Sequence, residues 1–318
     1  MICKAHMGAE PVSIRYPGGE DRKTVVATVD DREIVVTKRT SASRAALEAC
    51  VLGGLGGQSG VPKLLGHSGQ FVLQSLLEGT RLSEALELAG PQDRQTLLVT
   101  AGTVLIDLQS QANSNALIEQ VPKIGVRDGW HHDFAHSPDR LAEAIKAPAP
   151  DFDLETSVAI ISERFSSFVK WDARPGNALV DGSGRVGWFD WEHCGVGSAE
   201  DDLVWLLADE WSPNVPEAEF QLLKLLAKTH GVDFKALTRR FQTKAVLHSM
   251  IRLGLIFRRK GDGPWWSAKS ALQNDRVGVS VAHVRRVVTR ADRWAAGHVH
   301  LRGLRGLLQD TLRHAETL

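Results

Sequence analysis

The sequence predicts an α+β protein in which a small β-rich N-terminal part is followed by a larger, mostly helical C-terminal part. Strand-like runs occupy residues 24–29 and 33–37, and the turn signal Asp30-Asp31 between them indicates a hairpin. Later in the chain, apolar residues recur at helical spacing, for example through residues 91–111. The 318 residues exceed the usual size of a single domain, so we expect two lobes or domains.

Further elements follow from capping and spacing signals. A helix is expected to begin near Ser41 or Ser43 and to stop at the Gly-Gly pair 53–54. Residues 178–180 and 186–189 are apolar and strand-prone, and the glycine-rich turn between them predicts a second hairpin. The later chain is expected to be helical over residues 199–211, 216–229, 235–260 and 281–314.

Composition is that of an ordinary globular protein, with 43% apolar and 24% charged residues. The three cysteines, Cys3, Cys50 and Cys194, are odd in number and far apart, which indicates neither a disulfide framework nor a cysteine-based zinc site. The N-terminus lacks an apolar segment of signal-peptide type, and the apolar runs are too short to span a bilayer. We therefore expect a cytoplasmic protein without a membrane partner.

The charges are unevenly distributed although the formal net charge is zero. From Lys228 to the end there are 18 Lys and Arg against 6 Asp and Glu, which leaves 20 against 32 in the preceding chain. A basic segment of this kind often binds an anionic substrate, nucleic acid or the acidic face of another protein. Solvated helix faces would explain the same count equally well.

The stretch 168–192 carries the densest set of candidate site residues and reads FVKWDARPGNALVDGSGRVGWFDWE. Asp172 and Asn177 fall in a loop, because the Pro-Gly pair before Asn177 cannot continue a helix. The hairpin that follows is expected to fold Asp190 back towards Asn177. Carboxylate and amide oxygens suit Mg²⁺, an ion that is usually held by few protein groups together with substrate phosphates. This pattern indicates a phosphoryl transferase.

The motif D-x-R-P-G-N at residues 172–177, followed by F-D-W-E at residues 189–192, resembles the catalytic and metal-binding loops of the aminoglycoside phosphotransferase and choline kinase family, within the protein-kinase-like fold. That family typically shows H-G-D-x-H-P-x-N and then a strand that ends in D-W-E. Here Lys170-Trp171 replaces the usual His-Gly. Arg174 replaces the second His and is similar to the protein kinases, where a basic residue at this position faces the transferred phosphate.

The resemblance implies a two-lobed fold with an N-lobe of residues 1–77, which binds the nucleotide, and a C-lobe of residues 78–318, which carries the catalytic loops and a helical substrate-binding region. Asp172 would orient the acceptor hydroxyl and take its proton, and Arg174 would face the transferred phosphate. The implied metal ligands are Asn177 and Asp190, with Glu192 as a helper through water.

The resemblance also assigns a nucleotide site. Lys38 closes the second strand in the pattern V-V-T-K, where the fold keeps a lysine on the nucleotide phosphates, and Arg39 is its near rival. Glu48 on the next helix would form an ion pair with Lys38, unless both are plain surface charges. A glycine-rich loop would cover the phosphates, and the adenine would bond backbone groups of the hinge. The residues for these roles are Gly18 and Gly19 in the loop, and Ser75, Leu76 and Leu77 in the hinge.

Three further features have open interpretations. The resemblance implies that Asp202 bonds the backbone of the catalytic loop as a structural residue, although an acidic residue near a helix start is favourable in any case. The histidines within residues 131–136 could bind zinc or belong to a substrate-facing insertion. The basic run 258–260 and the Trp pair 265–266 could bind an anion and stack on a ligand, or the rings could lie in the core.

These observations favour an ATP-dependent phosphotransferase that uses Mg²⁺ and moves the γ-phosphate to a hydroxyl of a small molecule. Cationic acceptors usually meet acidic pockets, so the basic C-terminal third favours a neutral or anionic acceptor over an aminoglycoside. One alternative is a protein kinase, although no clear A-P-E segment follows Asp190. The other is a catalytically silent nucleotide-binding module, which Lys170-Trp171 would allow. Nucleic-acid binding through the basic tail is not expected, and the oligomeric state is left open.

Overall fold

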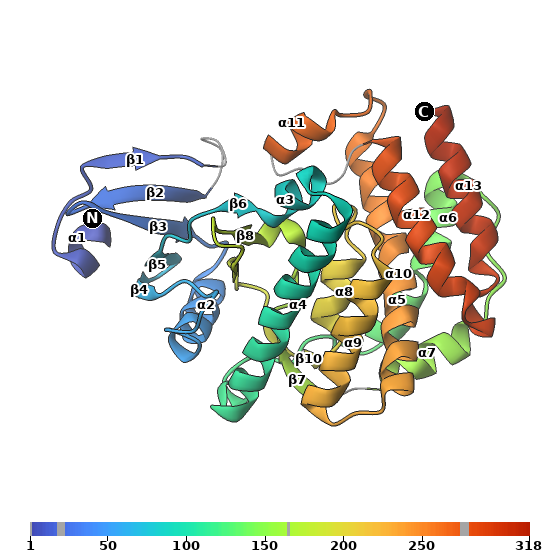
Figure 1. Ribbon diagram of the computed structural model, residues 1–318, viewed down its shortest axis with the longest axis horizontal. Coiled ribbons are helices and arrows are strands. Elements are labelled where there is room, and N and C mark those ends of the chain that lie inside the picture. The colour runs from blue at the N-terminus through green and yellow to red at the C-terminus, as the bar shows by residue number, and fades with distance from the viewer. Residues whose placement is uncertain (1, 18–22, 164–165, 274–279) are drawn as a thin grey trace.

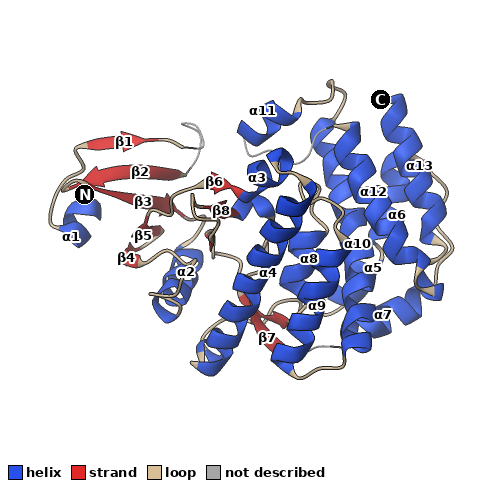
Figure 2. Ribbon diagram, in the orientation of Figure 1, coloured by secondary structure: helices blue, strands red, loops and turns tan. Residues whose placement is uncertain are grey.

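The computed structural model describes residues 2–17, 23–163, 166–273 and 280–318. A β-rich N-terminal part lies beside a larger helical C-terminal part, as Figures 1 and 2 show. The predicted α+β fold is therefore confirmed. The main sheet uses strands from residues 13–75 alone. A lobe boundary between residues 77 and 78 stays a prediction.

In the described part of the N-terminal region, five strands form an antiparallel sheet in the order β1-β2-β3-β5-β4. The predicted hairpin is present, because β2 pairs with β3 up to the partners Val29 and Arg32. Its turn residues Asp30 and Asp31 have φ of 47° and 59°, the left-handed backbone that a two-residue hairpin turn requires. The strands are β1 (Ser13–Arg15), β2 (Thr24–Val29), β3 (Arg32–Lys38), β4 (Leu64–Ser68) and β5 (Phe71–Ser75).

Helices cover both faces of this sheet. The short α1 (Ile2–Met7) lies on the face that carries Leu73, where it forms a small core with the sheet. The longer α2 (Ala42–Gly54) packs on the opposite face, with Val72 in the same core as the helix. Ser41 caps α2 by accepting a hydrogen bond from the Arg44 amide at 3.2 Å, as the capping signal predicted.

The C-terminal part is built around two long helices, α4 (Pro91–Ser114) and α10 (Phe234–Lys260). The second predicted hairpin is present as β8 (Ala178–Val180) and β9 (Val186–Trp188). No helix within the described ranges is both long and apolar enough to cross a membrane. The other elements up to residue 273 are β6 (Thr80–Arg81), α3 (Leu82–Leu88), η1 (Leu117–Glu119), α5 (Trp130–Ala135), α6 (Ser137–Ile145), α7 (Leu154–Ser162), β7 (Ser166–Val169), η2 (Pro175–Asn177), β10 (Gly195–Ser198), α8 (Asp201–Leu207), α9 (Pro216–His230) and α11 (Ala268–Gln273).

The single helix expected over residues 281–314 is wrong. The chain instead forms α12 (Val281–Ala296) and α13 (Leu304–Thr317), which pack against each other, with η3 (Val299–Leu301) between them. The break falls at His298, which has extended backbone with φ of −132° and ψ of 123°. Further along, a Cβ atom at Gly303 would lie 1.6 Å from the main-chain oxygen of Asp151. Only glycine allows the two backbones to approach this closely.

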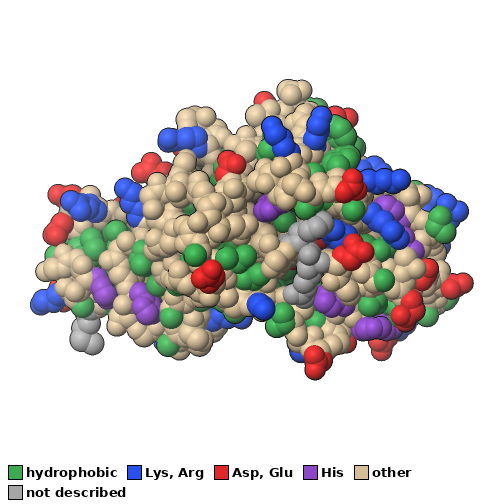
Figure 3. Space-filling model, turned by 90° about the horizontal axis from the view of Figure 1, so that it is seen from below, with side chains coloured by type: hydrophobic (Ala, Val, Ile, Leu, Met, Phe, Trp, Pro, Cys, Tyr) green, Lys and Arg blue, Asp and Glu red, His purple; other side chains and the backbone are tan. Residues whose placement is uncertain are grey.

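Many basic residues of the C-terminal third are paired with acidic residues from earlier in the chain. Arg252 donates to both carboxylate oxygens of Glu210, at 2.5 and 2.8 Å. Lys244 donates to Glu200 at 2.9 Å and to Asp201 at 2.7 Å. On the face drawn in Figure 3, basic and acidic side chains are interspersed. Further pairs of the same kind are Arg240–Glu200, Arg286–Glu87 and Arg293–Glu219.

Candidate active site

The predicted catalytic loop has an unusual backbone. Trp171 and Asp172 have φ of 53° and 51°, and Asp190 has φ of 63°. Residues other than glycine seldom adopt this left-handed conformation, and a tryptophan adopts it at a cost. Such strain is typical of functional sites, where the surrounding structure holds the residue in place. Three strained residues within the stretch 168–192 therefore mark it as the candidate active site.

Asp172 and Asn177 are in direct contact. The Asn177 side-chain amide donates to the Asp172 carboxylate at 2.9 Å and to its main-chain oxygen at 3.0 Å. The amide of Phe189 donates to the main-chain oxygen of Asn177 at 3.1 Å, which brings Asp190 beside this pair as expected. Arg174 lies over the same carboxylate, with Nε 3.6 Å from Asp172 Oδ1. The structure thus brings the four residues to one partly exposed place.

Arg39 joins the two halves of the site. Its guanidinium makes a bidentate contact with the buried Glu48 of α2, at 2.5 Å for each bond. The same group donates to Asp190 at 2.6 Å and to Glu192 at 3.2 Å. Burial alone would lower the pKa of Arg39, but these carboxylates raise it, so the side chain stays charged. Arg44 adds a second link, because it donates to the main-chain oxygen of Glu192 at 2.7 Å.

The expected ion pair between Lys38 and Glu48 is wrong, because Arg39 takes that place. Side chains alternate along a strand, so Lys38 and Arg39 point to opposite faces of the sheet. Lys38 is exposed, with Nζ 5.9 Å from the centre of the Phe71 ring. Residues 34–37 are buried on both faces, because α1 covers one face and α2 the other. The burial pattern therefore gave no sign of which basic residue faces Glu48.

Lys170, which stands where the resembled family has histidine, is fully buried behind the catalytic loop. Its ammonium donates to the main-chain oxygen of Asp190 at 2.8 Å and lies 5.2 Å from the ring centre of Trp191. Burial lowers the pKa of Lys170, and the charges of Asp190, Asp172 and Asp202 oppose that shift. The lysine therefore ties the strained Asp190 to the catalytic loop.

Asp202 supports the catalytic loop from α8. Its carboxylate accepts from the main-chain amides of Lys170 at 2.9 Å and Trp171 at 2.8 Å, which is the contact implied by the resemblance. It also accepts from Gln109 at 2.9 Å, and Gln109 bonds the main-chain oxygen of Ala199 at 3.0 Å. Burial raises the pKa of Asp202 to about 6, although these three donors stabilise the carboxylate. Gln109 was not predicted as a site residue, although it directly follows Leu108, where the resembled family often has Leu-His.

The nucleotide-binding candidates are only partly placed. Ser75 ends β5, and its amide already donates to the Lys63 oxygen at 2.9 Å. Leu76 and Leu77 follow in a loop outside the sheet. Gly18 and Gly19 lie outside the described residues. The predicted hinge therefore lies between β5 and β6.

The donor set fits a magnesium site that substrate phosphates complete. In its side-chain hydrogen bonds to described residues, Asn177 uses only its amide nitrogen, which leaves the side-chain oxygen available to a metal. Asp190 uses only Oδ1, in the contact with Arg39. Mg²⁺ is usually held by one or two such protein oxygens, waters and phosphates. Among the residues that the structure describes, no cluster of three or more His, Cys, Asp and Glu side chains could hold a metal.

Other predicted ligand groups are engaged within the chain. Asp133 pairs with Arg127, and His136 pairs with Asp139 at 2.6 Å. Lys260 is buried and donates to the main-chain oxygens of Gly261 and Gly263, with Nζ 5.1 Å from the Trp265 ring centre. The lysine and one tryptophan therefore close a loop instead of facing a ligand. The exposed Arg258 and Arg259 are the members of this basic run that remain at the surface.

Comparison with known families identifies the class of protein. Residues 14–224 match the family described as "Phosphotransferase enzyme family". This match covers more than half of the chain, so the chain belongs to the phosphotransferase enzyme family. No curated protein matches it.

Solved structures share the fold at low sequence identity. Macrolide 2′-phosphotransferase MphH from Brachybacterium faecium is 19% identical, with a TM-score of 0.58 over 87% of this chain and 96% of that one. The GDP complex of aminoglycoside 2′-phosphotransferase-IIIa is 13% identical, with a TM-score of 0.58 over 82% and 91%. Spectinomycin phosphotransferase APH(9)-Ia, in complex with ADP and spectinomycin, is 13% identical, with a TM-score of 0.53 over 82% and 88%.

Proposed function

We propose that the protein is an ATP-dependent phosphotransferase that moves the γ-phosphate to a hydroxyl group of a small molecule. The observation that carries the proposal is the contact of Asp172 with Asn177, beside Asp190, in a strained loop. Family membership and the nucleotides in the related structures support it. A loose phosphoryl-transfer transition state requires positioning and charge neutralisation, and the site supplies both.

Asp172 orients the acceptor hydroxyl and accepts its proton late in the reaction. The bond between the γ-phosphorus and the bridging oxygen of ATP breaks, a bond to the acceptor oxygen forms, and ADP leaves. Asn177 holds the carboxylate in place through its amide, which fixes the oxygen that faces the acceptor. Arg174 lies close enough to offset charge on the transferred group. This division of roles needs no covalent enzyme intermediate.

Arg39 takes the role that the resemblance gave to Lys38, which is to pair with Glu48 and to supply positive charge near the nucleotide phosphates. Its link to Glu48 fixes the guanidinium, and its contact with Asp190 places positive charge beside the predicted metal ligand. Asn177 and Asp190 would hold Mg²⁺, with Glu192 close by. When bound, the ion would neutralise the phosphate oxygens of the nucleotide. Ser75, Leu76 and Leu77 are proposed to bond the adenine through their backbone.

We propose a neutral or anionic acceptor and not a polyamine antibiotic, because the exposed Arg258 and Arg259 leave part of the basic C-terminal third at the surface. A silent nucleotide-binding module is the second candidate, because Lys170 and Trp171 replace the usual residues of the motif. The hydrogen bond of Lys170 to the main chain of Asp190 argues against a silent module, because it holds Asp190 in place beside the catalytic loop. A protein kinase is the third candidate, and it predicts phosphate transfer to a peptide hydroxyl.

A coupled assay of ADP release tests the proposal. The protein is incubated with ATP, Mg²⁺ and a broad panel of hydroxyl acceptors. We expect acceptor-dependent ADP release that falls by about a thousandfold in Asp172→Asn. Asp107→Asn, an exposed acid on α4, is the matched control and should keep full activity. Nucleotide binding without turnover on any acceptor would instead support the silent module.

A further inference from the structure

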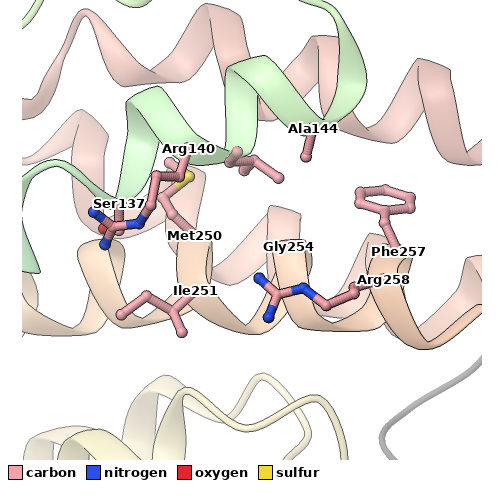
Figure 4. Close-up of a pocket in the computed structure, with 9 residues that line it drawn as sticks. Ser137, Arg140, Ala144, Met250, Ile251, Gly254, Phe257 and Arg258 are labelled. Atoms are coloured by element: carbon pink, nitrogen blue, oxygen red, sulfur yellow. The ribbon is translucent and has the colours of Figure 1, made fainter.

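Two pockets of a size that suits small molecules lie in different parts of the molecule. One, of about 410 Å³, lies between α6 and α10, and all of its described lining residues belong to these two helices (Figure 4). The other, of about 630 Å³, lies between α2 and the segment 120–124 and reaches Trp171 and His193. Trp171 precedes the proposed base Asp172, and His193 follows Glu192. This second cavity, the α2 pocket, therefore borders the candidate active site.

The α2 pocket is a neighbour of the proposed active site and not a part of it. Its described lining residues include neither the proposed base nor any of the proposed metal ligands. The Asp172 carboxylate contacts Asn177, and the carboxylates of Asp190 and Glu192 contact Arg39. A ligand in the α2 pocket would therefore touch the catalytic loop without taking the place of the acceptor beside Asp172.

The walls of the α2 pocket combine apolar and basic groups. Leu47 of α2 and Ile124 of the opposite segment are apolar, and the catalytic loop contributes the half-buried ring of Trp171. Arg44 of α2 and Lys123 of the opposite segment add two positive charges. No acidic side chain is among the described residues that line the pocket. This lining matches a flat or apolar molecule that carries an anionic group.

Arg44 is held in place by the chain and still has donors for a ligand. Its Nη1 donates to the main-chain oxygen of Glu192 at 2.7 Å and contacts Nδ1 of His193 at 3.2 Å. Its Nε and Nη2 groups make no hydrogen bond to a described residue. The exposed Lys123 makes no side-chain hydrogen bond or ion pair within the described ranges. Both cations can therefore bind an anion inside the pocket.

The α2 pocket is connected through α2 to the residues proposed to serve the nucleotide and the metal. This helix carries both Arg44, which bonds the Glu192 main chain, and the buried Glu48, which holds Arg39. Arg39 in turn donates to Asp190, a proposed metal ligand. A ligand that bound Arg44 together with the opposite wall would hold α2 in the position that this network requires. It should therefore strengthen nucleotide binding, and the nucleotide should strengthen binding of the ligand by the same factor.

We propose that the α2 pocket binds a small organic anion with an apolar body, as an effector that strengthens binding of the magnesium nucleotide. Leu47, Ile124 and Trp171 bury the body of the effector, and Arg44 and Lys123 bind its anionic group. The binding site depends on the lining of the pocket alone. The effect on the nucleotide rests on the proposed phosphotransferase function.

The thiol of Cys50 lines the pocket and reports its occupancy. Cys3 and Cys194 are buried, and burial raises the pKa of the Cys194 thiol, so iodoacetamide should alkylate Cys50 first. Naphthalene-1-sulfonate, at about ten times its dissociation constant, should slow alkylation of Cys50 by about tenfold. The uncharged naphthalene-1-sulfonamide at the same concentration should not. Mass spectrometry of the Cys50 peptide measures both rates, and equal rates with the two compounds would overturn the anion site.

Two pairs of variants test the lining by calorimetric titration with the sulfonate. Ala46→Phe fills the pocket from α2, and its control Ala42→Phe adds the same ring at an exposed position of the same helix outside the lining. Lys123→Ala removes one positive charge, and its control Lys228→Ala removes an exposed lysine of α9. We expect Ala46→Phe and Lys123→Ala each to weaken the affinity by about tenfold, and the controls to keep it. Equal affinity in Ala46→Phe and Ala42→Phe would overturn the location of the site.

The effector role is tested by the Kd of ADP with Mg²⁺, in the presence and absence of naphthalene-1-sulfonate. We expect the sulfonate to tighten ADP binding by about fivefold in the wild type and to have no effect in Ala46→Phe. Unchanged or weaker ADP binding, together with protection of Cys50, would overturn the effector role while the anion site stands. Protection of Cys50 in a protein that binds no nucleotide would instead overturn the proposed phosphotransferase function. The two failures are therefore distinguishable.

Discussion

Two regions of the molecule use their arginines in opposite ways. Arg39 is bound to the three carboxylates of Glu48, Asp190 and Glu192. Arg140 and Arg258, on the other side, have no ion pair or hydrogen bond to the residues that the structure describes. A guanidinium with occupied donors fixes geometry, whereas one with open donors is ready for a ligand. The arginine of the candidate active site therefore belongs to a connected network of charges, whereas the two arginines between α6 and α10 remain exposed.

Breaking the network at Arg39 is expected to have the largest effect. Arg39→Ala leaves three carboxylates without their counter-charge, so unfolding free energy should fall by about 3 kcal/mol or more. ADP release should fall by about a hundredfold, because Asp190 loses its fixed position. Lys38→Ala, one residue away and exposed, should change neither. Urea unfolding and the ADP assay measure both effects. A larger loss in Lys38→Ala would show that the lysine, and not the arginine, serves the nucleotide.

Lys170 tests the same network from behind the loop. Lys170→Met removes the charged donor to the part-buried main-chain oxygen of Asp190, at a cost of about 1 to 3 kcal/mol. We expect turnover to fall by about tenfold, with partial recovery in Lys170→His. The exposed Lys63→Met serves as control. Normal stability and normal turnover in Lys170→Met would show that Lys170 does not support the catalytic loop.

The pH dependence of stability sharpens the role of Asp202. Its pKa is raised to about 6 by burial, so the folded state keeps this proton to a higher pH than the unfolded state. Its contribution to stability is therefore present below about pH 4 and is lost as the pH rises through about 6. The Asp202→Asn variant has no carboxyl group at this position, so its unfolding free energy does not change with pH for this reason. The unfolding free energy of the wild type minus that of the variant should fall by about 2 to 3 kcal/mol from pH 4 to pH 7. A difference that stays constant with pH would contradict the assignment.

The smallest expected effect is a shift of Tm when Gly254 of α10 is replaced. Gly254→Ala replaces a helix-interior glycine where space is open, so Tm should rise by about 1 to 3 °C. Calorimetry measures this shift. A lower Tm would show that the native structure requires glycine at this position.

The sequence predicted the part of the site that lies close together along the chain. Asp172, Asn177 and Asp190 share one loop and one hairpin, so turn and strand signals alone place them near each other. The N-terminal hairpin and the cap at Ser41 are local in the same sense. These signals concern backbone geometry, which neighbouring residues determine.

The remaining features depend on contacts between distant segments. Lys38 and Arg39 could not be ranked, because α1 and α2 bury both faces of β3. The break between α12 and α13 lets the two helices pack against each other, which is a contact between distant residues. The charge of the C-terminal third is largely matched within the fold, which composition alone could not show. The pocket, too, needs α6 beside α10.

The most direct test of the account is a separation of kcat from KM on one accepted acceptor. Asp172→Asn should lower kcat by about a thousandfold with KM nearly unchanged, because Asp172 serves the chemical step. Asp107→Asn, which changes an exposed acid on α4, should leave both kcat and KM nearly unchanged. An Asp172→Asn variant that keeps its kcat would contradict the assignment of Asp172 to the chemical step.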